Sequence, residues 1–277
     1  MEAFISYLNG IIWSSALIYL CLGAGLYFSL RTRFLQVRHF RHMIKIMTEG
    51  RSSEAGVSSF QALTMSLSGR VGTGNIAGVA TAIAVGGPGA VFWMWTVAFL
   101  GASTAYIEAT LAQIYKEKDD NGNYRGGPAY YIEKSMGQKW YAWTFAVATV
   151  VAMGFCLPGI QANSIAAAME NAWTVPVEYT AGALAFGLLL IVVGGVKRIA
   201  HFAQVAVPLM AAGYIAVSFA VVFANLEMVP AVVKLIINSA FGLDAGFGAI
   251  VAMAVQWGVK RGVYSNEAGQ GSGPHPA

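Results

Sequence analysis

Long apolar runs recur along this chain and constrain its fold more than any other feature. Several of them approach the roughly 20 apolar residues that a helix needs to cross a bilayer. The composition agrees, because 57% of the 277 residues are hydrophobic and only 11% are charged, whereas soluble domains carry about 25% charged residues. The sequence therefore predicts an all-α polytopic membrane protein and excludes a large soluble core.

The basic residues predict how the chain crosses the membrane. Six of the 17 Lys and Arg lie within residues 31–51, five more lie within 116–139, and Lys197 and Arg198 form a third site. Loops rich in Lys and Arg stay on the cytoplasmic side. We therefore expect a multi-pass protein of the cytoplasmic (inner) membrane, with the N-terminus outside and loops 31–56 and 116–139 cytoplasmic. A nucleic-acid partner would also fit the first cluster, but topology and membrane lipid explain it without one.

Seven spans alternate with these loops. The first lacks the basic start and the small-residue cleavage site of a signal peptide, so we expect it to remain as a helix. Short helices are expected in the polar loop near 129–137 and after residue 225. The expected spans cover about residues 8–30, 57–85, 90–115, 140–169, 178–196, 199–224 and 245 onward.

The second span contains a polar, glycine-rich interruption over Gly69–Gly78, with Arg70 inside it. Each Gly costs a helix about 1 kcal/mol relative to Ala, and unwound backbone in lipid is tolerated only where it is buried in protein or lines a polar cavity. Freed N–H groups at the start of the next half-helix would hold a carboxylate, and freed carbonyls would hold a cation. Close helix packing is the alternative explanation of the glycines. A dinucleotide or phosphate loop is excluded, because no strand precedes the motif and no Lys follows it.

A second copy of the motif favours the binding-site interpretation. The stretches that begin at Arg70 and Arg261 both fit R-x-x-x-x-N-x-A-G, and they start 191 residues apart. Each copy interrupts a predicted span, and the two spans run in opposite directions. Paired interrupted helices in two halves of a chain indicate a transporter site between inverted repeats. Five spans separate the copies, which predicts a five-helix repeat.

The motifs in this order resemble the alanine or glycine:cation symporter family. The similar stretches are "SGRVGTGNIAGVATAI", "GGPGAVFWMW", "GGPAYYIEKSMG", "GIQANSIA" and "KRGVYSNEAGQGSGPHPA". The resemblance implies a leucine-transporter-like fold of two inverted five-helix repeats behind one extra helix. It divides the chain into the extra helix and basic loop (1–56), the first repeat with its outer loop (57–244) and a truncated start of the second repeat (245–277).

The resemblance also implies the site and its ligands, a small neutral amino acid (alanine or glycine) and Na⁺ as the coupling ion, with no other cofactor. Backbone N–H groups of Thr73 and Gly74 would bind the substrate carboxylate, and carbonyls of Ser68 and Val71 would lie near the cation together with Asn75. The remaining substrate-binding positions are Asn75, which is assigned to both ligands, Gln161, Asn266 and the backbone near Gly269.

Ionisable residues in apolar context are functional hypotheses. One hypothesis is that Arg70 and Glu267 pair and couple the two broken helices; the alternative is that each of them snorkels or pairs locally. Glu108 is expected near the cytoplasmic interface in a structural role.

Three functional classes compete for this pattern. A channel would need a symmetric filter or a continuous polar stripe, and neither is visible. A membrane enzyme would need a nucleophile, a base or a metal cluster within the spans, but the four His and two Cys are too scattered. Secondary active symport by alternating access explains both interruptions. Because a second repeat would end near residue 440, we also expect this 277-residue chain to be an N-terminal fragment that does not transport alone.

Overall fold

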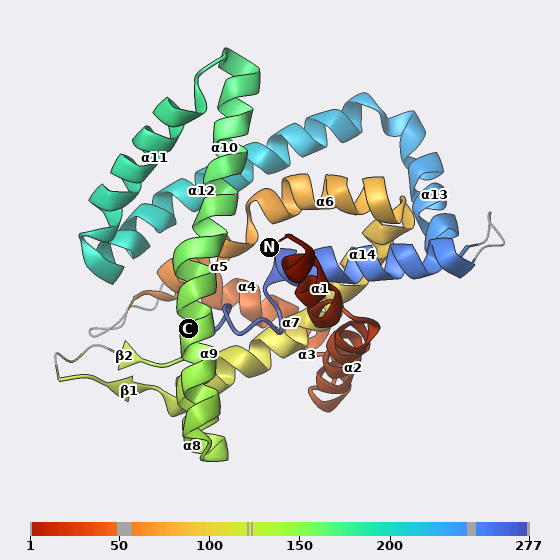
Figure 1. The fold of residues 1–277 in the computed structure, drawn as a ribbon. Helices are drawn as coiled ribbons and strands as arrows, with labels where there is room; N and C mark the ends of the chain where they lie inside the picture. The colour runs from red at the N-terminus through yellow and green to blue at the C-terminus, as the bar shows by residue number, and fades with distance from the viewer. Residues whose placement is uncertain (1, 49–56, 121, 123, 243–247, 276–277) are drawn as a thin grey trace. The chain divides into compact units, whose positions relative to one another are not determined.

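The computed structural model describes residues 2–48, 57–120, 122, 124–242 and 248–275, and most of them are helical (Figure 1). Turns and irregular segments connect the helices, and two short strands, β1 (Glu117–Lys118) and β2 (Tyr124–Arg125), form an antiparallel hairpin. The helices are α1 (Glu2–Ile12), α2 (Ser15–Arg31), α3 (Leu35–Arg38), α4 (Phe40–Thr48), α5 (Ser59–Arg70), α6 (Thr73–Gly86), α7 (Gly89–Tyr115), α8 (Pro128–Met136), α9 (Lys139–Val151), α10 (Leu157–Trp173), α11 (Val177–Val192), α12 (Gly195–Ala224), α13 (Val229–Phe241) and α14 (Gly248–Asn266).

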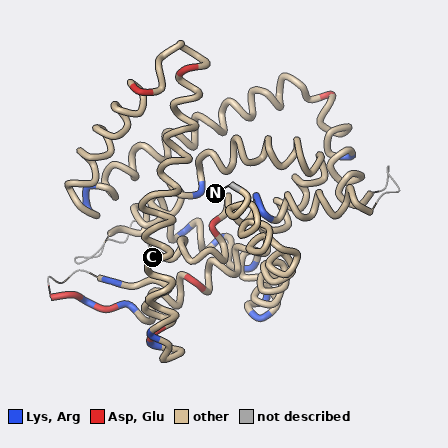
Figure 2. Tube along the Cα trace, viewed as in Figure 1, with Lys and Arg blue, Asp and Glu red and all other residues tan. Residues whose placement is uncertain are grey.

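Four helical stretches of the described residues are long and apolar enough to cross a membrane: Ala3–Arg31, Gly89–Tyr115, Lys139–Trp173 and Gly195–Ala224. The stretch Lys139–Trp173 joins α9 and α10 through a π-helical turn over Ala152–Cys156. A shorter apolar helix, α11, lies between this stretch and Gly195–Ala224. Figure 2 shows the consequence for charge, since the traces of α6, α7 and α12 carry few acidic or basic residues. The prediction of a helical, multi-pass membrane protein is confirmed.

The expected spans match helices of the structure. Two of the spans, however, are each divided into two helices. Residues 57–85 form two helices, α5 and α6, as the glycine-rich interruption predicts. The expected short helix in the polar loop is α8, and the one after residue 225 is α13. The first span is also interrupted, at Trp13 and Ser14 between α1 and α2, and the sequence analysis did not predict this.

The chain divides into two compact units that are each built from separate stretches. The first unit contains Met1–Met43, Gly74–Glu108 and Gly213–Gly273, and the second contains Ile44–Thr73, Ala109–Ala212 and Pro274–Ala277. Packing therefore groups residues that are distant in sequence. The division into an extra helix and two repeats follows the sequence rather than the packing of residues. It stays a prediction.

The core of the first unit lies where α2, α7 and α14 meet. Ile18, Val97, Val259 and Val263 are buried together there. Small residues allow the helices to approach closely, as is typical of membrane proteins. A Cβ at Gly258 of α14 would lie only 2.5 Å from the Ala90 carbonyl oxygen of α7.

A buried polar cluster also joins α2 to α7 in this unit. The hydroxyls of Ser29 and Ser103 lie 3.0 Å apart, and Ser103 donates to the Gly25 carbonyl at 3.0 Å. Gln36, just beyond α2, donates to the Ser29 hydroxyl at 3.1 Å. These bonds satisfy polar groups that would be costly to leave unpaired in an apolar environment. They make α2 an integral part of the first unit.

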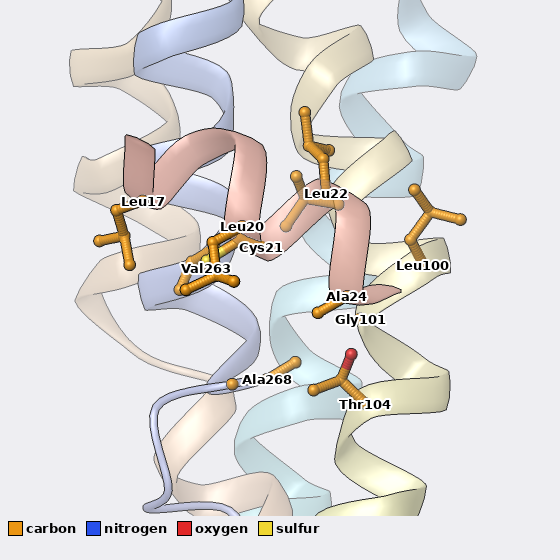
Figure 3. A pocket seen from close by; sticks show the side chains of 12 residues that line it. Leu17, Leu20, Cys21, Leu22, Ala24, Leu100, Gly101, Thr104, Val263 and Ala268 are labelled. Atoms are coloured by element: carbon orange, nitrogen blue, oxygen red, sulfur yellow. The ribbon is translucent and has the colours of Figure 1, made fainter. Parts of the chain in front are cut away.

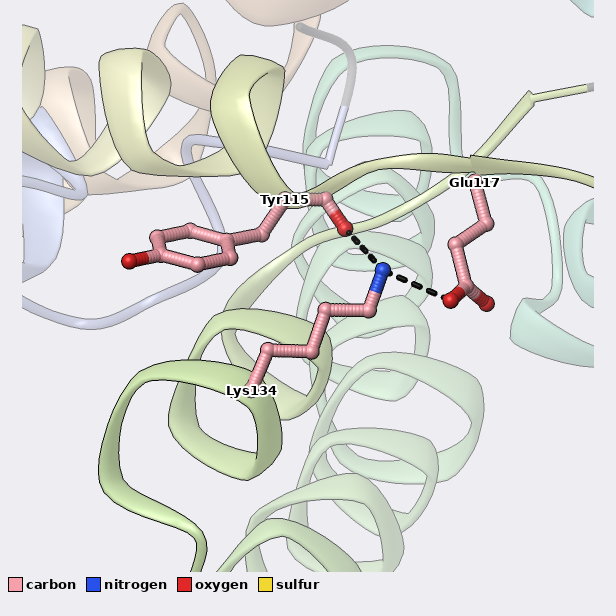
Figure 4. A network of polar contacts seen from close by, with 3 residues as sticks. All are labelled: Tyr115, Glu117 and Lys134. Carbon is pink, nitrogen blue, oxygen red and sulfur yellow. Dashed lines mark hydrogen bonds and ion pairs between the residues drawn. The ribbon is translucent and has the colours of Figure 1, made fainter.

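In the second unit, one lysine fastens the polar loop to the end of α7 (Figure 4). Lys134 of α8 donates to the Tyr115 carbonyl at 2.9 Å and pairs with the Glu117 carboxylate at 2.6 Å. Arg125 of β2 pairs with Asp119 at 3.2 Å. The loop that the charges predict is therefore a folded hairpin and helix.

Candidate functional site

The break between α5 and α6 occupies only two residues. Helix α5 ends at Arg70, Val71 is extended with φ −100° and ψ 95°, and α6 begins at Thr73. The expected interruption over Gly69–Gly78 is therefore narrower than its glycine content indicates, and Gly74 and Asn75 belong to the first turn of α6. The first turn of a helix carries backbone N–H groups without intrahelical partners, so these residues remain potential donors to a ligand.

Thr73 and Gln161, both predicted substrate-binding residues, lie together in the second unit. The Thr73 N–H donates to the side-chain oxygen Oε1 of Gln161 at 3.3 Å. A Cβ at Gly72 would lie 3.1 Å from Nε2 of the same side chain, so the missing side chain makes room for Gln161. The Thr73 hydroxyl is buried and has no hydrogen-bond partner among the described residues.

Gly74 and Asn75 have their contacts in the first unit, with the end of α14. A Cβ at Gly74 would lie 3.2 Å from two ring carbons of Tyr264, so the glycine lets this ring lie close against α6. The Ser265 hydroxyl donates to the side-chain oxygen Oδ1 of Asn75. The start of α6 and the end of α14 are thus in direct contact.

The second break follows α14. The helix ends at Asn266, after which Glu267 and Gly269 have positive φ values of 51° and 86°. Asn266 donates its side-chain amide to the Gly262 carbonyl at 2.8 Å, within its own helix. The Gly269 N–H donates to the Glu108 carboxylate of α7 at 3.3 Å.

The two copies of the sequence motif differ in the motif position at which the helix ends. In the first copy, the helix ends at Arg70, the motif's arginine, and the motif's asparagine, Asn75, lies in the next helix. In the second copy, Arg261 lies inside α14, and the helix ends at the motif's asparagine, Asn266. The echo therefore predicts that both regions are interrupted, but it does not predict where each interruption falls.

Two of the predicted cation-binding residues make local hydrogen bonds through groups other than the predicted ligand atoms. Ser68 donates its hydroxyl to the Met65 carbonyl at 2.6 Å, and the Val71 N–H donates to the Leu67 carbonyl at 2.8 Å. The carbonyls of Ser68 and Val71 stay predicted ligands, as does Asn75. Arg70 and Glu267 belong to different units, and their pairing also stays a prediction.

Three residues at these breaks were not predicted as site residues: Tyr264, Ser265 and, as a partner of the second break, Glu108. The hydroxyl of Tyr264 is buried and has no hydrogen-bond partner among the residues that the structure describes. Tyr264 and Ser265 occupy variable positions of the motif, directly before Asn266. Their place in the sequence could have indicated a role, because residues next to a helix end lie close to the segments that this end contacts.

A cavity of about 280 Å³ lies beside the second break, in the first unit (Figure 3). Its walls come from α2, α7 and the end of α14, and they are mostly apolar. Cys21 contributes a sulfur and Thr104 a hydroxyl. The lining residues nearest the break are Val263, Ala268 and Gly269.

Comparison with known proteins identifies the family. The profile of the Sodium:alanine symporter family matches residues 1–277, the full length of the chain. The chain belongs to this family. It is a family of membrane transporters rather than of enzymes, in agreement with the sequence-based prediction.

Individual relatives agree with this assignment. A Bacillus subtilis protein, provisionally named as a sodium/proton-dependent alanine carrier, is 60% identical over 277 residues, which are 100% of this chain and 57% of the relative. A second B. subtilis protein, named provisionally as a sodium/glutamine symporter, is 45% identical over 100% of this chain and 58% of its own length. A sodium/alanine symporter of Methanococcus maripaludis is 39% identical over 98% of this chain and 61% of its own length. The chain thus spans 57–61% of the length of these relatives.

Proposed function

We propose that this chain carries the substrate-binding helix ends of a secondary active transporter that moves a small neutral amino acid together with Na⁺. The observation that carries the proposal is the Thr73 N–H at the start of α6, which already holds a side-chain oxygen, Oε1 of Gln161, at 3.3 Å. The donor lies at the positive end of a helix dipole, where a carboxylate is favoured. A substrate carboxylate oxygen would take the position that the amide oxygen has here.

The contacts around the first turn of α6 favour a small substrate. Gln161 fills the space next to Gly72, and the Tyr264 ring fills the space next to Gly74. Within each unit, a side chain thus already occupies the space beside the glycine, which supports a substrate without a long side chain. Alanine or glycine fits this restriction better than glutamine does, and two of the three relatives described above are named for alanine. Asn266 and Gly269 would complete the pocket from the second break.

Sodium is proposed as the coupling ion. Main-chain carbonyls released at a helix break are typical ligands of Na⁺ in transporters with discontinuous helices. Val71 and Gly72 form such a break, and Ser68 and Asn75 lie within four residues of it. The name of the B. subtilis relative that is 60% identical mentions both sodium and protons. A proton gradient is therefore the alternative driving force.

The proposal includes a fold and an orientation. Two interrupted helical regions and the family membership support a leucine-transporter-like arrangement of inverted repeats with alternating access. The Lys and Arg content of loops 31–56 and 116–139 supports a cytoplasmic position for both loops. The N-terminus would then lie outside the cell.

Uptake of labelled alanine into proteoliposomes tests this function. Two proteins are compared, the 277-residue chain and a chimera that continues after residue 277 with the remaining part of the B. subtilis relative that is 60% identical. The complete relative is the control. Uptake driven by an inward Na⁺ gradient and competed by glycine supports the proposal. A chimera that transports neither alanine nor glycine, under conditions where the complete relative does, contradicts it.

The same assay separates the alternatives. Uptake that follows a proton gradient in the absence of Na⁺ would replace sodium as the coupling ion. Competition by glutamine in preference to alanine would replace the substrate.

A further inference from the structure

One face of α7 contacts the unwound end of α14. Gly101, Thr104 and Glu108 are spaced by three and four residues, which places them on the same side of a helix. All three meet the short segment formed by Ala268 and Gly269. A Cβ at Gly101 would lie 2.9 Å from the Ala268 Cβ, and a Cβ at Gly269 would lie 3.9 Å from Cγ2 of Thr104. The Glu108 carboxylate accepts the Gly269 N–H at 3.3 Å.

The segment needs such support because the helix has ended. The Glu267 N–H still donates to the Val263 carbonyl at 3.0 Å, with the spacing of a helical bond. Beyond it, the left-handed conformations of Glu267 and Gly269 turn the chain away from the helix axis. The Gly269 N–H, released at this point, donates to the Glu108 carboxylate. A carboxylate is a stronger acceptor than a neutral oxygen, because a charged partner strengthens the bond.

The contacts also limit how the segment can move. Ala268 is buried, with 7% of its surface exposed, and it lies directly against Gly101. On the side of α2, the cavity lined by Ala268, Gly269 and Cys21 leaves open space (Figure 3). Helix α7 therefore supplies both apolar contacts and a polar contact to the segment, and the polar contact is the bond to Glu108.

We propose that Glu108 is a positioning residue for the binding site: its carboxylate holds the Gly269 N–H and thereby fixes the unwound end of α14. Part of this inference rests on the proposed function, because Gly269 is a predicted member of the substrate pocket. The positioning itself does not. A transport-independent measurement can therefore separate the two.

Hydrogen–deuterium exchange of the 277-residue chain in lipid nanodiscs measures the position of this segment without transport. Glu108→Ala removes the acceptor, and we expect exchange of the amides in a peptide covering Gly269 to rise about tenfold. Glu108→Gln keeps a side-chain oxygen of similar reach and should restore most of the protection. Glu170→Ala, which removes an exposed acid from α10, is the control and should leave the segment unchanged.

Three outcomes would overturn the proposal. The first is unchanged exchange at Gly269 in Glu108→Ala. The second is a rise that also includes peptides of α2 and of the first half of α7, because Glu108 would then serve the general structure. The third is equal loss of protection in Glu108→Gln and Glu108→Ala. If Glu108→Ala does not yield folded protein, Glu108→Asp withdraws the carboxylate by one methylene and gives the same test.

A second arm uses the transporting chimera. Glu108→Ala should raise the substrate concentration at half-maximal uptake at least fivefold, with the maximal rate within about twofold of the parent. Glu108→Gln should restore it. A fall in the maximal rate alone would contradict positioning. Failure of the parent chimera to transport would count against the proposed function and would leave the exchange result as it stands.

Discussion

At the scale of single residues, Gln161 connects the sequence pattern most directly to a testable chemistry. Its amide oxygen accepts a hydrogen bond from the Thr73 N–H at 3.3 Å. A Cβ on Gly72 would lie only 3.1 Å from its amide nitrogen. The glycine thus creates the space and the helix start supplies the donor. A neutral amide can give way to an incoming carboxylate, because its bond to the backbone is weaker than a charged one.

We predict that Gln161→Glu raises the alanine concentration at half-maximal uptake at least tenfold in the transporting chimera. The new carboxylate would bind the Thr73 N–H with a charge-assisted bond, and it would repel and compete with the substrate carboxylate; a difference of about 1.4 kcal/mol corresponds to tenfold. The measurement is uptake against alanine concentration at a fixed Na⁺ gradient. Asn171→Asp makes the same chemical change at the exposed end of α10 and should have no effect. A half-saturation within twofold of the parent would show that this donor does not meet the substrate.

At the scale of helices, the sequence predicted the elements well and the interruptions less well. Apolar runs of membrane length determine where α7, α9 with α10, and α12 occur, since a bilayer leaves the backbone no other way to satisfy its hydrogen bonds. The break before α6 was predicted from its glycines. The break at Trp13 and Ser14 and the π-helical turn over Ala152–Cys156 were not, because tertiary contacts rather than propensity decide such irregularities.

Helix packing in the first unit leads to a prediction about two neighbouring glycines of α2. A Cβ at Gly25 would lie 2.9 Å from the Leu100 Cβ and 3.2 Å from its carbonyl carbon, whereas a Cβ at Gly23 would have no atom within 4 Å. Gly25→Ala should lower the apparent melting temperature, with a loss of about 1–3 kcal/mol from overpacking. Gly23→Ala should be neutral or stabilising, because Ala is the better helix former.

Thermal unfolding of the two variants in the same detergent, followed by the fraction that remains monodisperse, measures this difference. Each variant acts as the other's control, since the substitution, the helix and the unit are the same. Equal melting temperatures would mean that α2 does not depend on close contact with α7 for its stability.

At the scale of the whole molecule, the sequence predicted some of the contacts around the candidate site. The glycines predicted a helix break before α6, and the family resemblance assigned Thr73 and Gln161 to the substrate site; these two residues contact each other in the structure. Tyr264, Ser265 and Glu108 were missed as contact residues, because their roles depend on which segments meet in three dimensions. A periodic pattern within one segment carries no information about a partner nearly 200 residues away. The echo of the motif and the family resemblance were the two features that pointed to the end of α14.

The orientation in the membrane follows from charges that the fold partly neutralises. In the polar loop, Lys134 pairs with Glu117 and Arg125 pairs with Asp119. The residues from Arg31 to Thr48 contain no acid. Lys and Arg set the topology almost independently of nearby acids. Both loops should therefore lie on the same, cytoplasmic side, and the helical stretch Lys139–Trp173 should carry the chain across to the outside.

We predict that Asp120 faces the cytoplasm and Glu170 faces the outside. In a background with Cys21→Ser and Cys156→Ser, a membrane-impermeant maleimide applied to intact spheroplasts should label Glu170→Cys within minutes. Asp120→Cys should react only after permeabilisation, and the background without cysteine should not react at all. Both positions have exposed side chains, so access from one side of the membrane rather than burial determines labelling. The reverse pattern would invert the orientation, and labelling of both positions in intact spheroplasts would mean that Lys139–Trp173 does not cross the membrane.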